Sequence, residues 1–312
     1  MNAYTLHAPN KMKVTLLNYG ATLQSFCLPS GHDIVLGFDH LDDYVAPHPY
    51  FGSAIGRVAN RIKDGQFSIE GQDYQVAINE GNNALHSGPK GFETHFWEAE
   101  LESSSIKFAH ISPHGDQGYP GTLKTTFRYA LDNEGLRLDM RAETSHPTPV
   151  NLTGHSYFNL SGGVINDHAL SLKADSYFET DDEGINLGDI KPLKDTIFDF
   201  RASRKIGDTS IDYHFNVPGT NLRKLATLFS PQGDKRLTLL SDLPGFQLYT
   251  GDLIGNRQGK AGQLYRNRSG IAFEPQYPPN AINLENITDT ILRPGQIWEH
   301  SIIYKIEERP LR

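Results

Sequence analysis

The fold class is decided by the stretch Leu123-Lys-Thr-Thr-Phe-Arg-Tyr-Ala-Leu131, Asp132-Asn-Glu-Gly135, Leu136-Arg-Leu-Asp-Met-Arg-Ala142. Every second residue of its two outer runs is mostly apolar or aromatic, and the residues between them are mostly polar. Side chains of a β-strand point alternately to its two faces, so this period of two indicates two strands with one buried face each. The four residues between the runs include a glycine and can form the turn of a hairpin. The stretch therefore predicts an antiparallel strand pair.

The same period continues outward along the chain. A second hairpin is predicted from Gln66–Ile69, a turn at 70–72 and a strand at 74–78, and alternation at Ile302, Tyr304 and Ile306 predicts a last strand. Long amphipathic helices, repeats of fixed period and Ser/Gly/Pro-rich linkers are not evident. Many short strands separated by turns predict an all-β protein, a large antiparallel β-sandwich forming one domain over residues 1–312.

Composition narrows the class of function. The formal charge is -8, from 29 basic and 37 acidic residues, which argues against a nucleic-acid-binding protein with a basic surface. No apolar run approaches the roughly 20 residues that span a bilayer, and the N-terminus lacks a signal-peptide pattern. The single cysteine, Cys27, allows no intrachain disulfide. We therefore expect a cytoplasmic protein that binds neither nucleic acid nor membranes.

Two distant segments contain a candidate acid–base pair. His155 lies in Asn151-Leu-Thr-Gly-His155-Ser-Tyr-Phe-Asn-Leu160, and Glu274 lies in Gly270-Ile-Ala-Phe-Glu274-Pro-Gln276. Histidine titrates near neutrality, and burial can bring a glutamate close to the same range. A single histidine is more often a core residue, so this interpretation depends on the other polar clusters in the chain.

Those clusters favour a carbohydrate site. Arginine and amide side chains offer forked hydrogen bonds that suit sugar hydroxyls or a carboxylate, and aromatic rings can pack against the sugar ring. His86 and His95 are nine residues apart with no cysteine nearby, which is a poor pattern for a metal site. The clusters are Gly56-Arg57-Val-Ala-Asn60-Arg61-Ile62, residues 82–97, Asp212-Tyr-His-Phe215 and residues 243–251 with Gln247.

Taken in order, these segments resemble the galactose mutarotase (aldose 1-epimerase) family nearly from end to end. The resemblance implies a β-supersandwich and an isomerase that interconverts the α and β anomers of free aldoses, with no cofactor and no metal. It rests on Asn18-Tyr-Gly-Ala-Thr22, Gly56-Arg-Val-Ala-Asn-Arg-Ile62, Asn83-Ala-Leu-His86, Gly118-Tyr-Pro-Gly121, the His155 segment, Tyr249-Thr-Gly251, Glu274-Pro-Gln276, Asn280-Ala-Ile-Asn283 and Leu292-Arg-Pro-Gly295.

The resemblance also implies roles for single residues. Glu274 resembles the family's catalytic base, and His155 resembles its catalytic acid. Before reaction, we expect Glu274 to be ionised and His155 to be protonated, with the nearby carboxylate of Asp212 favouring the charged form of His155. The residues that resemble the family's sugar-binding set are Asn60, Arg61, His86, Asp212 and Gln247. The expected partner is a small monosaccharide, and the expected state is a monomer or a homodimer. The choice between galactose, glucose, xylose and arabinose stays open, because Gly154, Pro275 and Ser87 depart from residues common in the family.

Three alternatives remain. An epimerase of the same fold acting on a hexose phosphate would need a basic pocket, for which Arg57 and Arg61 are available. A non-catalytic sugar-binding protein would have no use for an acid–base pair. Glycoside hydrolysis would use two carboxylates, and Asp212 with Glu274 could supply them.

Overall fold

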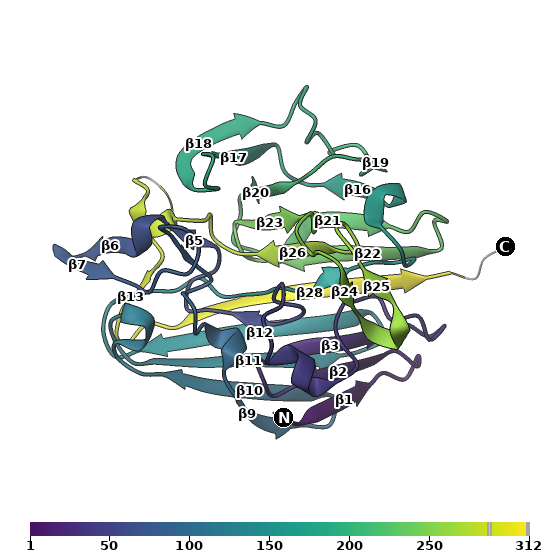
Figure 1. Ribbon diagram of the computed structural model, residues 1–312, viewed down its shortest axis with the longest axis horizontal. Helices are drawn as coiled ribbons and strands as arrows, with labels where there is room; N and C mark the ends of the chain where they lie inside the picture. The colour runs from purple at the N-terminus through teal and green to yellow at the C-terminus, as the bar shows by residue number, and fades with distance from the viewer. Residues whose placement is uncertain (286, 288, 310–312) are drawn as a thin grey trace.

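The chain folds into an all-β protein built from large antiparallel sheets (Figure 1), as the alternating pattern predicts. The structure is a computed structural model that describes residues 1–285, 287 and 289–309. Its two largest sheets have nine and six strands, and the named strand pairs within them are antiparallel. Among the described residues, none of the short helical turns has the length or hydropathy that a bilayer-spanning helix requires.

The nine-stranded sheet contains the hairpin that decides the fold class. In spatial order its strands are β19 (Arg204–Lys205), β16 (Ala169–Leu172), β21 (Arg223–Phe229), β22 (Lys235–Ser241), β28 (Trp298–Glu308), β12 (Gly135–Thr144), β11 (Leu123–Leu131), β10 (Ser105–Ser112) and β9 (Glu98–Leu101). The last long strand of the chain, β28, lies between β22 and β12 and so joins the two halves of the sheet.

The six-stranded sheet lies beside the larger one (Figure 1) and supplies part of the polar cavity described below. Its strands are β15 (Tyr157–Phe158), β26 (Ile271–Pro275), β23 (Gly245–Tyr249), β20 (Asp212–Asn216), β17 (Ser176–Thr180) and β18 (Asn186–Pro192). A three-stranded sheet at the start of the chain consists of β1 (Ala3–His7), β2 (Lys13–Leu17) and β3 (Thr22–Cys27).

Short strand pairs and 3-10 turns connect these sheets. The pairs are β4 (Ala54–Ile55) with β14 (Thr153–Gly154), β5 (Arg61–Ile62) with β8 (Ala84–Leu85), β6 (Gln66–Ile69) with β7 (Gln72–Gln75), β13 (Thr148–Pro149) with β27 (Ile291–Leu292), and β24 (Arg257–Gln258) with β25 (Leu264–Tyr265). The turns are η1 (Leu41–Tyr44), η2 (Lys63–Gly65), η3 (Phe92–Thr94), η4 (Asp116–Gly118), η5 (Ile165–Asp167), η6 (Lys260–Gly262) and η7 (Ala281–Asn283).

The first predicted hairpin is confirmed with its register. Strands β11 and β12 pair so that Leu131 faces Leu136, and the Asp132 carboxylate accepts the backbone N–H groups of Glu134 and Gly135 in the turn. A glycine is required at position 135, where φ is 150° and an added Cβ would lie 2.0 Å from the Tyr304 carbonyl oxygen of β28. The absence of a side chain at Gly135 thus lets strand β28 lie close to the turn.

The second predicted hairpin is correct in place and wrong in extent. Ile69 pairs with Gln72, so the turn has only Glu70 and Gly71, both with positive φ. That geometry matches the twist of a tight hairpin. Pairing ends at Gln75, because the chain then leaves the strand and its backbone bonds to the Gly65 carbonyl through Val76 N.

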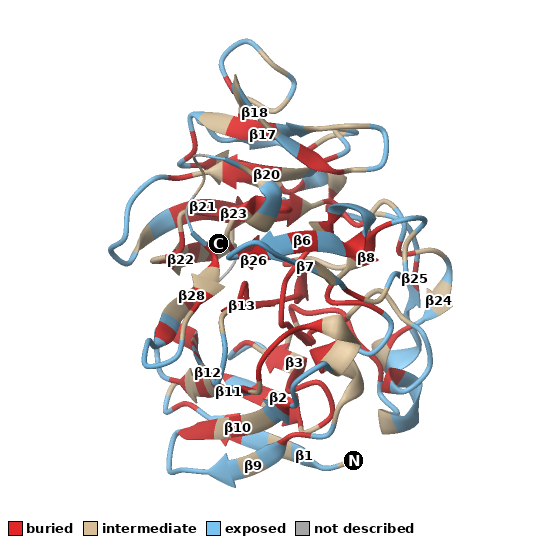
Figure 2. Ribbon diagram, turned by 90° about the vertical axis from the view of Figure 1, so that its left-hand side faces the viewer, coloured by how far each residue is buried: buried red, intermediate tan, exposed pale blue. Residues whose placement is uncertain are grey.

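The largest hydrophobic cluster of the described residues lies between the sheets. Phe127 of β11, Leu138 of β12 and Tyr304 of β28 belong to the same buried cluster as Phe158 of β15 and Phe273 of β26. Figure 2 shows this buried interior surrounded by exposed turns. Burial of apolar area on facing sheets is the main favourable term in such a fold.

The six-stranded sheet therefore has one apolar face and one polar face. Phe273 and Leu248 are paired neighbours in the core. Because successive side chains alternate across a strand, the next residues along β26 and β23, Glu274 and Gln247, project from the opposite face and are also paired neighbours. Asp212 on β20 projects from this second face as well. The polar face carries the candidate site.

Candidate active site

Six of the seven predicted site residues line one cavity of about 180 Å³. This volume is below the roughly 300–1,000 Å³ of sites for drug-sized ligands, and suits a smaller molecule. Glu274 and Asp212 come from the six-stranded sheet, and the others come from connections that cross it. The six residues are Asn60, Arg61, His86, His155, Asp212 and Glu274.

His155 and Glu274 meet as the sequence predicts. The distance from His155 Nε2 to Glu274 Oε1 is 3.5 Å, and their side chains are only 5% and 2% exposed. Strand β26 fixes Glu274, whereas His155 follows the short strand β14 and is held by a bond from its backbone N–H to the Ser53 carbonyl. The distance is longer than a good hydrogen bond, as is common in catalytic pairs without substrate.

Burial favours the uncharged form of both groups. It lowers the pKa of His155 to about 4 and raises the pKa of Glu274 well above its ordinary value, with a smaller contribution from Asp212. Burial therefore favours a protonated Glu274 and a neutral His155 when no sugar is bound. Both shifts run opposite to the expected ionised Glu274 and protonated His155 in the sugar-free protein, because desolvation is the largest cause of each.

Asp212 also acts differently from the expectation. Its Oδ1 accepts a hydrogen bond of 2.7 Å from Gln247 Nε2, and its charge is among those that raise the pKa of Glu274. The groups that shift the pKa of His155 do not include Asp212. Gln247 itself is the seventh predicted residue, and it lies behind Asp212 instead of lining the cavity.

Arg61 is held by a carboxylate that the sequence analysis missed. Its Nε and Nη2 donate to Glu80 Oε2 and Oε1 at 2.5 and 2.9 Å, a bidentate ion pair at the cavity wall. Such a fork fixes the guanidinium plane. The backbone N–H of Arg61 donates to the Asn60 Oδ1 at 2.9 Å, which leaves the Asn60 amide nitrogen as a donor for the cavity.

His86 is arranged as a hydrogen-bond donor. The backbone N–H of Asn60 donates to His86 Nδ1 at 3.1 Å, so Nδ1 carries a lone pair. Burial keeps the pKa of His86 well below its ordinary value. The ring is therefore neutral with its proton on Nε2, the nitrogen left for the cavity.

The same geometry argues against a metal ion. Ligand atoms of His86, His155 and Glu274 lie within 4.8 Å of one another, a spacing that three metal ligands could have. Coordination through His86 Nε2 would need a proton on Nδ1 and an acceptor beside it. The Asn60 N–H occupies that place instead, so the group fits sugar hydroxyls better than a metal.

Arg57 does not belong to the site. It is 1% exposed, and its guanidinium donates to Ser112 and Thr148 and to the carbonyl oxygens of Pro113, Pro120 and Gly121. These bonds fasten two loops beside the core. The suggestion that Arg57 and Arg61 share a pocket is wrong, because Arg61 lines the cavity and Arg57 is not among its lining residues.

Two departures from the family pattern have structural consequences. Ser87 Oγ accepts from the Val58 backbone N–H and donates to the Val58 carbonyl, so it fixes the loop next to His86. Gly154 faces the core, where an added Cβ would lie 3.4 Å from Leu138 and 3.9 Å from the Tyr304 hydroxyl. A side chain at this position would point away from the cavity.

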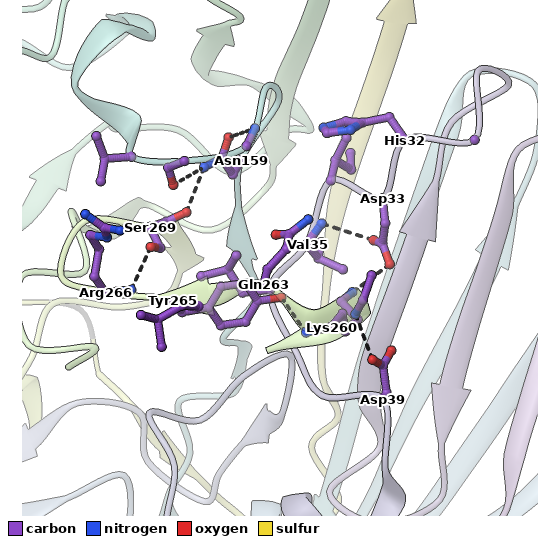
Figure 3. A pocket seen from close by; sticks show the side chains of 18 residues that line it. His32, Asp33, Val35, Asp39, Asn159, Lys260, Gln263, Tyr265, Arg266 and Ser269 are labelled. Atoms are coloured by element: carbon purple, nitrogen blue, oxygen red, sulfur yellow. Dashed lines mark hydrogen bonds and ion pairs between the residues drawn. The ribbon is translucent and has the colours of Figure 1, made fainter. Parts of the chain in front are cut away.

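A larger hollow of about 760 Å³ shares no lining residue with this cavity (Figure 3). Its buried cation is already engaged, because Lys260 Nζ donates to Asp33 Oδ2 at 2.6 Å and to the Gln24 carbonyl at 2.8 Å. Its Asn159 bonds to backbone carbonyls, including that of Ser269. None of the seven predicted site residues lines this larger hollow.

Sequence reasoning missed Tyr50 and Glu80, which both line the cavity. Tyr50 has a ring beside His86 and His155 and a φ of 56°. A signal for Glu80 existed in principle, since a partly buried arginine such as Arg61 needs a carboxylate or several acceptors. The sequence gives no spacing that selects this carboxylate among 37 acidic residues.

Comparison with known proteins places this chain in a family. The model of the aldose 1-epimerase family matches residues 2–305. The chain is 37% identical to human galactose mutarotase over 310 residues, covering 94% of this chain and 91% of that protein. It is 31% identical to aldose 1-epimerase of Escherichia coli strain K12, covering 96% and 94%. The chain belongs to the aldose 1-epimerase family, whose members are isomerases of carbohydrate metabolism acting on monosaccharides.

Solved structures agree with this placement. A GalM/aldose epimerase homologue from C. elegans superposes with a TM-score of 0.93 at 28% identity, covering 99% of both chains. Galactose 1-epimerase from Lactobacillus acidophilus superposes with a TM-score of 0.87 at 30% identity, covering 99% of this chain and 95% of that one. The fold is therefore galactose mutarotase-like.

Proposed function

We propose that this protein interconverts the α and β anomers of a free aldose such as galactose or glucose by acid–base opening of the sugar ring. The observation that carries the proposal is the buried pair of His155 and Glu274, 3.5 Å apart at a cavity of about 180 Å³. Membership of the aldose 1-epimerase family supports it.

The proposed reaction needs one base and one acid. Ionised Glu274 takes the proton of the anomeric hydroxyl O1, and the electrons of that O–H bond form the carbonyl at C1. The C1–O5 bond breaks, and O5 takes a proton from His155. Rotation about C1–C2 and closure on the other face reverse both transfers. Each well-placed acid or base contributes roughly 10²–10⁴-fold in rate.

The position of the pair's proton changes during this cycle. Burial favours it on Glu274 in the sugar-free protein. The reactive form needs it on His155, so sugar binding must stabilise the Glu274 carboxylate. Arg61 already acts in this sense, because its charge lowers the pKa of Glu274. Ring opening then returns the pair to the uncharged form that burial favours.

The remaining predicted residues bind the sugar in this proposal. The Nε2–H of His86, the free amide nitrogen of Asn60 and the Arg61 guanidinium donate to hydroxyls, and Asp212 accepts from them. Gln247 positions the Asp212 carboxylate through their 2.7 Å bond.

The alternatives have weaker support. A sugar phosphate would need several cations at one pocket, and Arg57 is committed to Ser112 and three carbonyl groups elsewhere. Glycoside hydrolysis would use Asp212 together with Glu274. The release of a reducing end from a glycoside would reveal that activity.

The test is polarimetry on freshly dissolved α-D-galactose, with and without the protein and beside the Glu274→Gln variant. We expect decay to the equilibrium rotation to be faster with the wild type, and the acceleration to be lost in the variant. The failure of wild-type protein to accelerate galactose, glucose, xylose and arabinose would overturn the proposal. Acceleration that persists in the variant would overturn the role of Glu274.

A further inference from the structure

Tyr50 lies at the cavity wall in an unusual backbone conformation. Its φ of 56° is in the left-handed region, which is uncommon for a bulky residue and often marks functional sites. The turn that carries it is bonded to the catalytic segment in both directions: Gly52 N donates to the His155 carbonyl, and His155 N donates to the Ser53 carbonyl. The backbone thus fixes Tyr50 relative to His155.

The Tyr50 ring packs on two site histidines. Its centroid lies 4.6 Å from that of His86 and 5.5 Å from that of His155. The His86 ring lies 5.3 Å from His155 in an edge arrangement, and the Tyr157 ring lies 5.0 Å from it. Three rings therefore enclose the imidazole of His155.

Among the described residues, no other residue holds the second nitrogen of this imidazole by a hydrogen bond. A catalytic histidine is usually held by an acceptor at its second nitrogen. Within the part of the chain that the structure describes, His155 Nδ1 is buried and has no hydrogen-bond partner. His86 differs, because the Asn60 N–H fixes its Nδ1. The packing of these rings therefore has a large part in setting the direction in which His155 Nε2 points.

We propose that Tyr50 is a positioning residue of the acid–base pair, whose ring holds His155 Nε2 toward Glu274 and keeps water from the imidazole. Tyr157 forms the other side of the packing from within a second, smaller buried cluster, where it is 1% exposed. Tyr50 comes from a half-buried turn and closes the side facing the cavity. This inference rests on the proposed role of His155.

Loss of the ring has two consequences. The imidazole gains freedom to turn away from Glu274, and water reaches it. Burial is the largest cause of the low pKa of His155, so hydration raises that pKa toward 6.5. The titratable groups around His155 are otherwise unchanged: Glu274, His86 and Tyr157 in contact, and His48 through its charge.

The test compares Tyr50→Ala and Tyr50→Phe with the wild type. Polarimetry gives kcat and KM, and an NMR titration of the His155 ring in the sugar-free protein gives its pKa. We expect Tyr50→Ala to lower kcat by about 10–100-fold, the size of effect that a misplaced catalytic group produces, and to raise the His155 pKa. Tyr50→Phe keeps the ring and should restore both values. Tyr74→Ala, a half-buried tyrosine of β7 outside the cavity, is the matched control.

The possible results distinguish a failure of the Tyr50 inference from a failure of the proposed function. Unchanged kcat and an unchanged His155 titration in Tyr50→Ala would overturn the inference, as would a Phe variant that fails to restore them. If Tyr50→Ala does not fold, Tyr50→Gly replaces it, because glycine accepts φ of 56° without strain. Wild-type protein without mutarotase activity would refute the proposed function instead, and the NMR comparison would still decide whether Tyr50 shields His155.

Discussion

Replacement of Arg61 by lysine should weaken sugar binding while leaving the chemistry nearly intact. The guanidinium donates from Nε and Nη2 to the Glu80 carboxylate, at 2.5 and 2.9 Å, which leaves Nη1 as a donor for the cavity. A lysine ammonium cannot bond bidentately to Glu80 and reach a sugar from the same plane. The charge stays near Glu274, so its effect on the pKa of that carboxyl is retained.

The expected loss of binding free energy is that of one hydrogen bond between the sugar and the charged Arg61 guanidinium, about 1.5–3 kcal/mol. Since about 1.4 kcal/mol corresponds to a factor of ten, KM should rise by about 10–150-fold with kcat nearly unchanged, the pattern of a lost uniform binding interaction. Arg61→Met loses the charge too. The pKa of Glu274 then rises further, and kcat should fall together with the rise in KM.

Initial rates by polarimetry over a range of α-D-galactose concentrations measure both constants, with circular dichroism as a check on folding. Glu80→Gln is the matched control, because it keeps the Arg61 charge and one acceptor, so KM should rise less than in Arg61→Lys. A Lys variant that loses kcat at constant KM would refute the reasoning. Lys and Met variants with the same kcat would refute the electrostatic part.

Three more results are expected. His155→Asn should lower kcat by about 10²–10⁴-fold in a folded protein, and near-wild-type kcat would contradict its role. As the pH falls, kcat/KM should decrease near pH 4, the pKa of His155. Below this pH the pair gains a second proton, and Glu274 cannot ionise. A decrease centred near pH 6.5 would contradict this prediction. Arg57→Lys should lose at least three of six buried hydrogen bonds, since lysine has three donors. At about 1 kcal/mol or more for each group left unpaired, the free energy of unfolding should fall by about 3 kcal/mol, and a loss well under 1 kcal/mol in denaturant titration would contradict it.

The strand pattern of the hairpin formed by β11 and β12 was predictable because it is a local property of the sequence. Alternation from Leu123 to Leu131 and from Leu136 to Ala142 reports directly which residues face the core, and the register of β11 and β12 follows from the turn. The end of the second hairpin was not predictable. Val76 bonds to Gly65 outside any strand, and alternation cannot reveal where a chain turns away.

The identity of the site residues was predictable from motifs, whereas their arrangement was not. Arg57 and Arg61 are four residues apart and chemically alike, yet one fastens loops beside the core and the other lines the cavity. Glu80 joins Arg61 only because β5 pairs with β8 and brings the loop before β8 close. Such partners are set by the packing of distant segments.

The sequence by itself determined an all-β chain and the residues that could carry acid–base chemistry, because side-chain period and residue type are local properties. The tertiary structure alone decided that His155 and Glu274 lie 3.5 Å apart, that the Tyr50 ring packs beside the imidazole, and that burial shifts the pKa values of both groups toward their uncharged forms. Desolvation depends on every atom around a group, and those atoms come from segments more than a hundred residues apart.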